Sequence, residues 1–248
     1  MTIKKSLFIA AFMLLATTMA NAAKKTIYKP WSNGKLKVSA NQRYLIHENG
    51  TPFFWLGNTA WLLPERLNRD EAEYFLAKER ELGYNVEQIQ VLNAIPTFNV
   101  YGQQANNKEF DFSKVSKPGV YGYWEHLDYI IDRAADNGIY IAMDCIWGSM
   151  IGQMDVKKAA AYGKFLGERY KDKPNIIWMI GGDILGDKSP EVWDALARAI
   201  KKYDNRHIMT FHPRGRTTSA RWFNDREWMD FNMFQSGHRR YGQLMSVC

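Results

Sequence analysis

Carboxylates and aromatic rings that follow short apolar segments are the side chains of this sequence best suited to chemistry. The segment Ile180-Gly181-Gly182-Asp183 places one carboxylate directly after an apolar run that ends in two glycines. Glycine lets the backbone turn tightly and lets a ligand approach closely. In partly apolar surroundings a carboxyl group has a raised pKa, which suits a general acid that protonates a leaving oxygen. Asp183 is therefore our candidate catalytic residue, although capping of the following loop explains its position equally well.

Two other carboxylates lie at similar places but have simpler explanations. Asp144 ends an apolar segment, and a buried, hydrogen-bonded role in orienting its neighbours explains it better than catalysis. Asp187 follows Gly186 and fits an Asx turn. We do not assign catalysis to either residue.

Aromatic rings beside polar groups indicate a sugar ligand, because rings pack on the C–H faces of sugars while the hydroxyl groups need hydrogen-bonding partners. Trp61 and Trp147 lie just beyond apolar segments, where packing in the core explains them less well than it explains Trp55 and Trp178. Arg214 suits bidentate contact with a substrate carboxylate and equally suits a salt bridge. The candidate substrate-binding residues are Asn58, Trp61, Trp147, His212, Arg214, Gln235 and His238.

Other chemistries lack their motifs in this sequence. The five histidines occur in no H-E-x-x-H arrangement or His/Cys cluster, and there is no G-x-S-x-G segment. We therefore expect no metal and no cofactor. The net charge of +7, from 33 Lys and Arg against 26 Asp and Glu, is spread without a basic block, so nucleic acid is not an expected partner.

The elements that must position these residues are strands alternating with helices. Such alternation, with nearly continuous apolar strands, predicts a parallel sheet buried on both faces. No G-x-G-x-x-G or Walker pattern opens a helix, and the polar residues gather after strand ends, so a (β/α)8 barrel of the TIM type is favoured over an open doubly wound sheet. Helices are expected at 68–83, 124–137 and 156–170 and from Ser189-Pro190 onward, and strands at 53–57, 84–92, 139–144, 175–180, 207–211 and 230–234. These are about six of the eight βα units of a barrel.

Residues 1–22 have the pattern of a secretory signal peptide. Lys4 and Lys5 precede an apolar stretch over 7–16, and Ala20-Asn21-Ala22 forms a cleavage signal. The apolar stretch is shorter than the roughly 20 residues that span a bilayer. We expect an exported, periplasmic or extracellular protein without membrane attachment after cleavage, in which residues 23–248 form one barrel domain that is incomplete at its C-terminal end.

Several ordered segments together resemble the apiosidase-like glycoside hydrolases, from about residue 35 to about residue 240. The resemblance implies a secreted barrel enzyme of pectin-degrading bacteria that acts on rhamnogalacturonan II, with Asp183 after the fourth strand as the acid/base. The family's other carboxylate is a Glu near the seventh strand, for which this chain has no matching position, and Asn58 stands where many relatives have Asp. The segments are Trp55-Leu56-Gly57-Asn58-Thr59-Ala60-Trp61, Phe165-Leu166-Gly167-Glu168-Arg169-Tyr170, Asn175-Ile176-Ile177-Trp178, Gly181-Gly182-Asp183, His212-Pro213-Arg214-Gly215, Asp230-Phe231-Asn232-Met233 and Gln235-Ser236-Gly237-His238.

The sequence thus predicts a glycoside hydrolase that cleaves plant pectin at apiose-containing side chains of rhamnogalacturonan II by a two-carboxylate mechanism. An inactive, truncated remnant that only binds carbohydrate is the alternative. A metal-dependent isomerase or lyase is less favoured, because no ligand cluster appears at the strand ends. The expected partner is a pectic oligosaccharide or polysaccharide, and with one of two carboxylates missing we expect the chain as it stands to have little or no activity.

Overall fold

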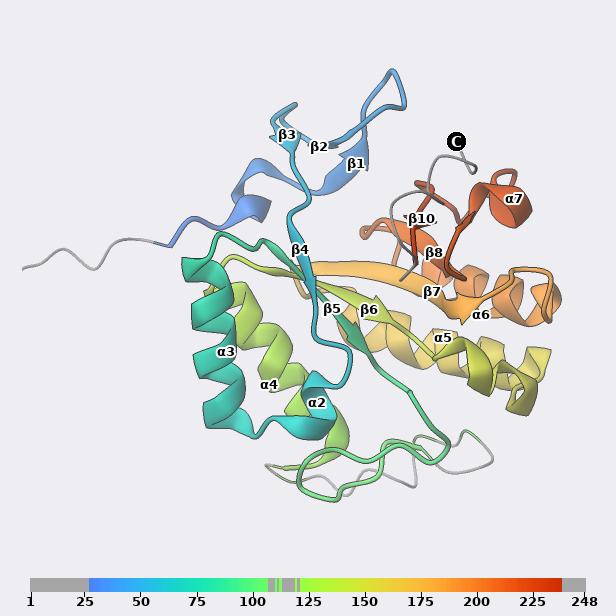
Figure 1. Cartoon of the computed structure of the whole chain (residues 1–248), viewed down its shortest axis with the longest axis horizontal. Helices are drawn as coiled ribbons and strands as arrows, with labels where there is room; N and C mark the ends of the chain where they lie inside the picture. Colours follow the sequence, from blue (N-terminus) through green and yellow to red (C-terminus); the bar gives the residue numbers. More distant parts are fainter. Residues whose placement is uncertain (1–26, 107–109, 111, 113–118, 120, 238–248) are drawn as a thin grey trace, which may run out of the picture.

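A parallel sheet of five strands forms the centre of the computed structural model, which describes residues 27–106, 110, 112, 119 and 121–237 (Figure 1). The strands pair in the order β4-β5-β6-β7-β8, so each strand lies beside its neighbours in sequence. Successive parallel strands joined through helices are the repeating unit of a (β/α)8 barrel. The predicted α/β barrel class is confirmed. The strands are β4 (Gly57–Thr59), β5 (Val86–Gln90), β6 (Tyr140–Asp144), β7 (Ile176–Ile184) and β8 (Met209–Pro213).

The helices begin and end close to where their sequence signals predict. At the start of α3 the Asn68 side chain accepts the Glu71 N–H and the Glu71 carboxylate accepts the Asn68 N–H, which is the predicted capping box. Ser189 precedes α6 as predicted, but it has a left-handed conformation and its side chain forms no cap. The helices are α2 (Leu63–Arg66), α3 (Arg69–Glu81), α4 (Tyr123–Asp136), α5 (Val156–Tyr170), α6 (Pro190–Tyr203) and α7 (Ala220–Phe223), with 3-10 turns η1 (Pro30–Asn33) and η2 (Gly148–Gln153).

Two apolar layers cover the two faces of the sheet. One joins the sheet to the helices and includes Trp178 and Phe211. The other includes Tyr140 at the start of β6, whose ring lies 5.4 Å from that of Phe53. Phe53 belongs to a small antiparallel sheet, which therefore packs at the amino end of the parallel strands. Its strands are β1 (Leu36–Val38), β2 (Leu45–His47) and β3 (Pro52–Phe53).

The sixth predicted strand, at 230–234, is wrong as a strand, although its residues lie where a sixth strand would. The Asp230 N–H donates to the Met209 carbonyl (2.9 Å), and the Thr210 hydroxyl donates to the Phe231 carbonyl (2.7 Å). The Met209 N–H also donates to the Asp230 carboxylate (2.7 Å), but one backbone bond and two side-chain bonds do not make a ladder. The chain then turns, and β10 (Phe234–Gln235) pairs antiparallel with β9 (Thr217–Thr218).

The first predicted strand, at 53–57, is divided between two sheets. Its beginning falls in β3 and its end in β4, and the Phe54 side chain between them is 78% exposed. An apolar run shows that a segment is suited to a sheet but not which sheet receives it. Residues 1–22, the predicted signal peptide, lie outside the described residues. No described helix has both the length and the apolar composition that crossing a bilayer requires.

A buried acidic side chain, Glu87, lies between the sheet and α3. Neither of its carboxyl oxygens has a hydrogen-bond partner among the described residues. Burial raises the pKa of Glu87 from 4.5 to about 8, and the negative charge of Glu79 on α3 adds to the shift. The folded chain therefore keeps a proton on Glu87 at neutral pH that the unfolded chain has released.

The Glu87→Gln variant tests this buried acid. Between pH 4.5 and 8 only the folded state binds the proton, so wild-type stability falls as pH rises through that window. Between pH 5 and pH 8.5 we expect the free energy of unfolding of wild type to fall by on the order of 2 kcal/mol more than that of the variant. Thermal unfolding followed by circular dichroism at both pH values measures the difference. Glu227→Gln, at an 87% exposed side chain, is the control, and parallel pH profiles of wild type and Glu87→Gln would contradict the assignment.

Candidate active site

Three rings meet at the carboxyl end of the parallel strands, next to Asp183. The ring centroids of Trp61 and Trp147 are 5.6 Å apart, and that of His212 lies 5.4 Å from Trp61 and 6.0 Å from Trp147. The Asp183 N–H donates to Nδ1 of His212 (3.3 Å). Residues after β4, after β6 and in β8 thus meet the carboxyl end of β7, at the rim where barrel enzymes bind substrate.

The two glycines before Asp183 make this arrangement sterically feasible. Gly181 and Gly182 have φ values of +111° and +115°, which side chains rarely allow, and the register between β7 and β8 shifts after Gly181. A Cβ atom on Gly182 would lie 2.6 Å from Cε3 of Trp147 and 2.9 Å from the Gly148 nitrogen. Asp183 itself has a φ of +51°. The end of β7 therefore needs glycine to bring Asp183 beside Trp147.

The Asp183 carboxylate is exposed and is oriented by a side chain. Nε2 of Gln235, on β10, donates to Oδ1 of Asp183 at 2.7 Å. The loop-capping explanation for Asp183 receives no support in the described part of the chain, because this bond comes from a glutamine side chain and not from loop amides. The partly apolar surroundings predicted for Asp183 are wrong, since the side chain lies at the open surface of the rim.

His212 is buried and accepts a hydrogen bond, and both features favour its neutral form. Burial lowers the pKa of His212 below 6.5, while the negative charge of Asp183 opposes the shift. Because Nδ1 accepts the Asp183 N–H, the proton of the neutral ring resides on Nε2. His212 therefore positions the Asp183 backbone as a neutral acceptor.

The burial expected at Asp183 is found one strand away, at Asp144. This residue ends β6 and is fully buried, and neither carboxyl oxygen has a hydrogen-bond partner among the described residues. Burial raises the pKa of Asp144 well above its usual value, and the charge of Asp183 raises it further. Two adjacent acids, one exposed and one buried, thus occupy the same rim.

A comparison with protein families and solved structures identifies the relatives of this fold and rim. Residues 39–246 match the model of the apiosidase-like catalytic domain. The chain belongs to the apiosidase-like family of glycoside hydrolases. No curated protein sequence matches it.

Solved structures agree with this membership. A family 5 glycoside hydrolase from Bacteroides vulgatus is 64% identical over 88% of this chain and 48% of its own length, with a TM-score of 0.85. The apiosidase-like chain thus spans about half the length of that relative. A putative glycoside hydrolase from the same organism (17% identity, TM-score 0.61, 79% of this chain and 41% of its own) shares the fold. An endo-1,4-β-D-mannanase from Thermotoga petrophila also shares the fold, with 18% identity and a TM-score of 0.53 over 66% of this chain and 56% of its own.

One of the predicted binding residues of the apiosidase-like chain faces away from the rim cluster. Asn58 is corrected by the structure: its side chain donates to Glu79 on α3 at 3.0 Å and so faces the helices. The reason is strand alternation, because Asn58 pairs in register with Glu87 on that same face. Arg214 is exposed in the loop after β8, where its N–H donates to the Ile184 carbonyl. His238 lies outside the described residues.

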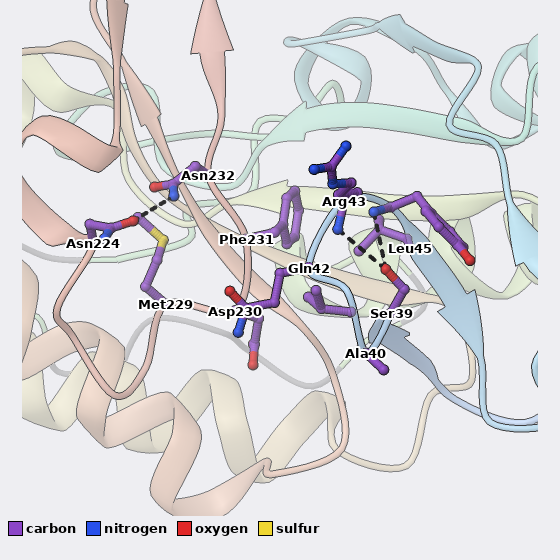
Figure 2. A pocket seen from close by; sticks show the side chains of 12 residues that line it. Ser39, Ala40, Gln42, Arg43, Leu45, Asn224, Met229, Asp230, Phe231 and Asn232 are labelled. Carbon is purple, nitrogen blue, oxygen red and sulfur yellow. Dashed lines mark hydrogen bonds between the residues drawn. The ribbon is translucent and has the colours of Figure 1, made fainter.

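A cavity of about 740 Å³ lies apart from the predicted site residues (Figure 2). It separates the turn between β1 and β2 from the segment after α7, and none of the predicted residues lines it. The sequence marks only one wall, since Asp230, Phe231 and Asn232 belong to a segment that resembles the family, and the other wall is distant in the chain. It is lined by Val38, Ser39, Ala40, Gln42, Arg43, Tyr44, Leu45, Asn224, Met229, Asp230, Phe231 and Asn232. The described residues contain no group of three or more side chains able to hold a metal ion.

The Gly182→Ala variant tests the steric basis of the rim. The added methyl group must displace Trp147 or the end of β7, so we expect a loss of about 2 kcal/mol or more of stability and a changed tryptophan emission spectrum. Gly152→Ala is the matched control, because nothing lies within 4 Å of its Cβ position. Thermal unfolding and fluorescence measure both effects. Equal behaviour of the two variants would show that the close approach to Trp147 is not a constraint.

Proposed function

We propose that this chain contributes the acid/base side of a glycoside hydrolase site for plant pectin, with apiose-containing side chains of rhamnogalacturonan II as the substrate class. The observation that supports the proposal best is the exposed Asp183 carboxylate at the rim, held by Gln235 beside Trp61 and Trp147. Family membership supports the hydrolase class. The pectic substrate rests on the family resemblance alone.

In this proposal Asp183 protonates the leaving glycosidic oxygen. Gln235 holds Oδ1 through a 2.7 Å hydrogen bond, which leaves Oδ2 to meet the substrate. The faces of Trp61 and Trp147 pack against the C–H face of a sugar, and this fixes the bond to be cleaved relative to Asp183. A correctly oriented acid contributes through both proton transfer and proximity.

The proposal requires a second carboxylate. Glycosidases use two, about 5–5.5 Å apart when they retain configuration and about 6.5–9.5 Å apart when they invert it. Asp144 is the carboxyl group that interacts with Asp183 in the described part of the chain, and its burial and raised pKa do not suit a nucleophile or base. Asp144 therefore does not fill the second role, which the family resemblance gives to a Glu near the seventh barrel strand.

A carbohydrate-binding protein without catalysis is the second candidate. The same aromatic rim supports it, and one accessible carboxylate is enough to bind a sugar hydroxyl. Both candidates need contact with a pectic glycan, so one set of variants separates them.

We also propose export to the periplasm or the extracellular space, from the signal-like pattern of residues 1–22.

Binding and hydrolysis of apiose-containing pectic oligosaccharides test the two candidates together. We expect wild type to bind them and Trp147→Ala to weaken binding about tenfold, equivalent to about 1.4 kcal/mol of lost ring packing. Asp183→Asn should retain binding and abolish any hydrolysis. Calorimetry and detection of released sugar measure these effects, with Asp187→Asn, at an exposed turn residue, as the control.

Each outcome has a distinct meaning. Binding without hydrolysis by wild type fits both a chain that supplies only the acid/base side and a carbohydrate-binding protein, whereas hydrolysis that is lost in Asp183→Asn favours the first. Hydrolysis that survives in Asp183→Asn contradicts the acid/base assignment. Absence of binding by folded wild type contradicts both candidates.

A further inference from the structure

The Asp144 side chain lies on the face of the sheet opposite the helices, at the carboxyl end of β6 where the rim begins. In the parallel register it lies beside Gln90 of β5 on one side and Met179 of β7 on the other. Met179 belongs to the apolar layer on the face opposite the helices. The Asp144 carboxyl group is therefore enclosed at the inner face of the sheet, directly below the rim.

The end of β7 and the segment after β6 cover this carboxyl group. A Cβ atom on Gly182 would lie 3.0 Å from Oδ2 of Asp144 and 2.6 Å from the Trp147 ring. Asp144 and Trp147 thus both border the space in which a Gly182 side chain would lie, one residue before Asp183. Displacement of the Asp144 side chain would move both of these site residues.

Among the described residues, no cationic group compensates a negative charge on Asp144. The titratable groups that interact with it are Asp183 at the end of β7, Cys145 next to it in the chain, and Tyr162 on α5. Burial raises the pKa of both Cys145 and Tyr162, and a charge on Asp144 would raise each further. The Ile146 N–H opposes the shift at Asp144 but does not reach hydrogen-bonding geometry. A buried carboxylate without donors is strongly disfavoured, whereas a neutral carboxylic acid is tolerated.

We propose that Asp144 is a positioning residue that works as a neutral carboxylic acid beneath Asp183, so that the two carboxyl groups together carry no more than one negative charge. Asp144 supports the contact between Gly182 and Trp147, and Asp183 alone exchanges a proton with the substrate. The inference rests on the proposed function only for the acid/base role of Asp183.

Carbon-13 NMR of the aspartate carboxyl groups tests the protonation state in the whole chain. We expect the Asp144 carbon to keep the chemical shift of a protonated acid at pH values where an unperturbed aspartate, with a pKa of about 3.9, is already ionised. In Asp183→Asn its titration midpoint should fall by at least about half a pH unit, because the neighbouring like charge is removed. Asp187→Asn should leave it unchanged. An Asp144 carboxyl group that is ionised at pH 6, or a midpoint that is the same in Asp183→Asn, would overturn the proposal.

A second pair of variants tests positioning. Asp144→Asn keeps a neutral group of the same shape, so two signals should match wild type. They are the nitrogen-15 shifts of His212, which report the bond from the Asp183 N–H to Nδ1, and the fluorescence emission of Trp147. Asp144→Ala leaves a void below Gly182 and should change both signals. If Asp144→Ala does not fold, a wild-type-like spectrum of Asp144→Asn still supports the proposal and a changed one overturns it.

These readouts separate the inference from the proposed function. Absence of glycan binding with the expected Asp144 titration would remove the proposed function and leave the buried neutral acid in place. Hydrolysis that depends on Asp183, together with an ionised Asp144, would keep the glycosidase proposal and remove the inference about Asp144.

Discussion

The close approach of three groups to Gly182 is the constraint on which the rim depends. The Trp147 ring, the Gly148 amide and the Asp144 carboxyl group all lie within 3.0 Å of the position that a Cβ atom of Gly182 would occupy. A left-handed backbone without side chains at Gly181 and Gly182 allows β7 to pass over them and to present Asp183 with its N–H on His212. The acid, the rings and the buried carboxyl group are therefore coupled through one strand end, and a change at any of them affects the others.

Buried acids in this fold differ in charge because they differ in the donors around them. The carboxyl oxygens of Asp144 and Glu87 accept no hydrogen bond of normal geometry among the described residues, and burial raises the pKa of each. Burial also acts to raise the pKa of Asp204, but hydrogen bonds from His207 and Trp178 lower it below the usual value. Asp204 is thus a buried anion that joins β7 to the turn after α6, while Asp144 and Glu87 are buried neutral groups. Burial by itself does not decide ionisation; the donors do.

Local patterns predicted much of this architecture. The capping box at Asn68 and the 156–170 helix follow from the spacing of a few residues, and the observed α5 has the predicted bounds. The meeting of Trp61, Trp147, His212 and Asp183 follows from a general property of parallel sheets, whose carboxyl ends share one edge. The first two predictions succeeded because short-range spacing determines them, and the third because parallel strands share one carboxyl edge.

The errors concern properties that depend on long-range pairing. The face on which Asn58 lies is set by its register with Glu87, and a sequence without pairing information does not reveal it. The segment at 230–234 has a strand-like composition, but its last residue, Phe234, belongs to the two-residue strand β10, which pairs with Thr217–Thr218. Asp144 is buried as its sequence position indicated, but its carboxyl oxygens lack the predicted hydrogen bonds among the described residues, and the exposure of Asp183 likewise depends on which residues the end of β7 covers.

A structure of the chain in complex with an apiose-containing pectic oligosaccharide tests the central claim most directly. The account predicts a sugar ring against Trp61 and Trp147, with a glycosidic oxygen about 2.6–3.2 Å from the Asp183 oxygen that Gln235 does not hold. A sugar bound instead in the cavity between the β1–β2 turn and the segment after α7, with Asp183 facing only solvent, would contradict it.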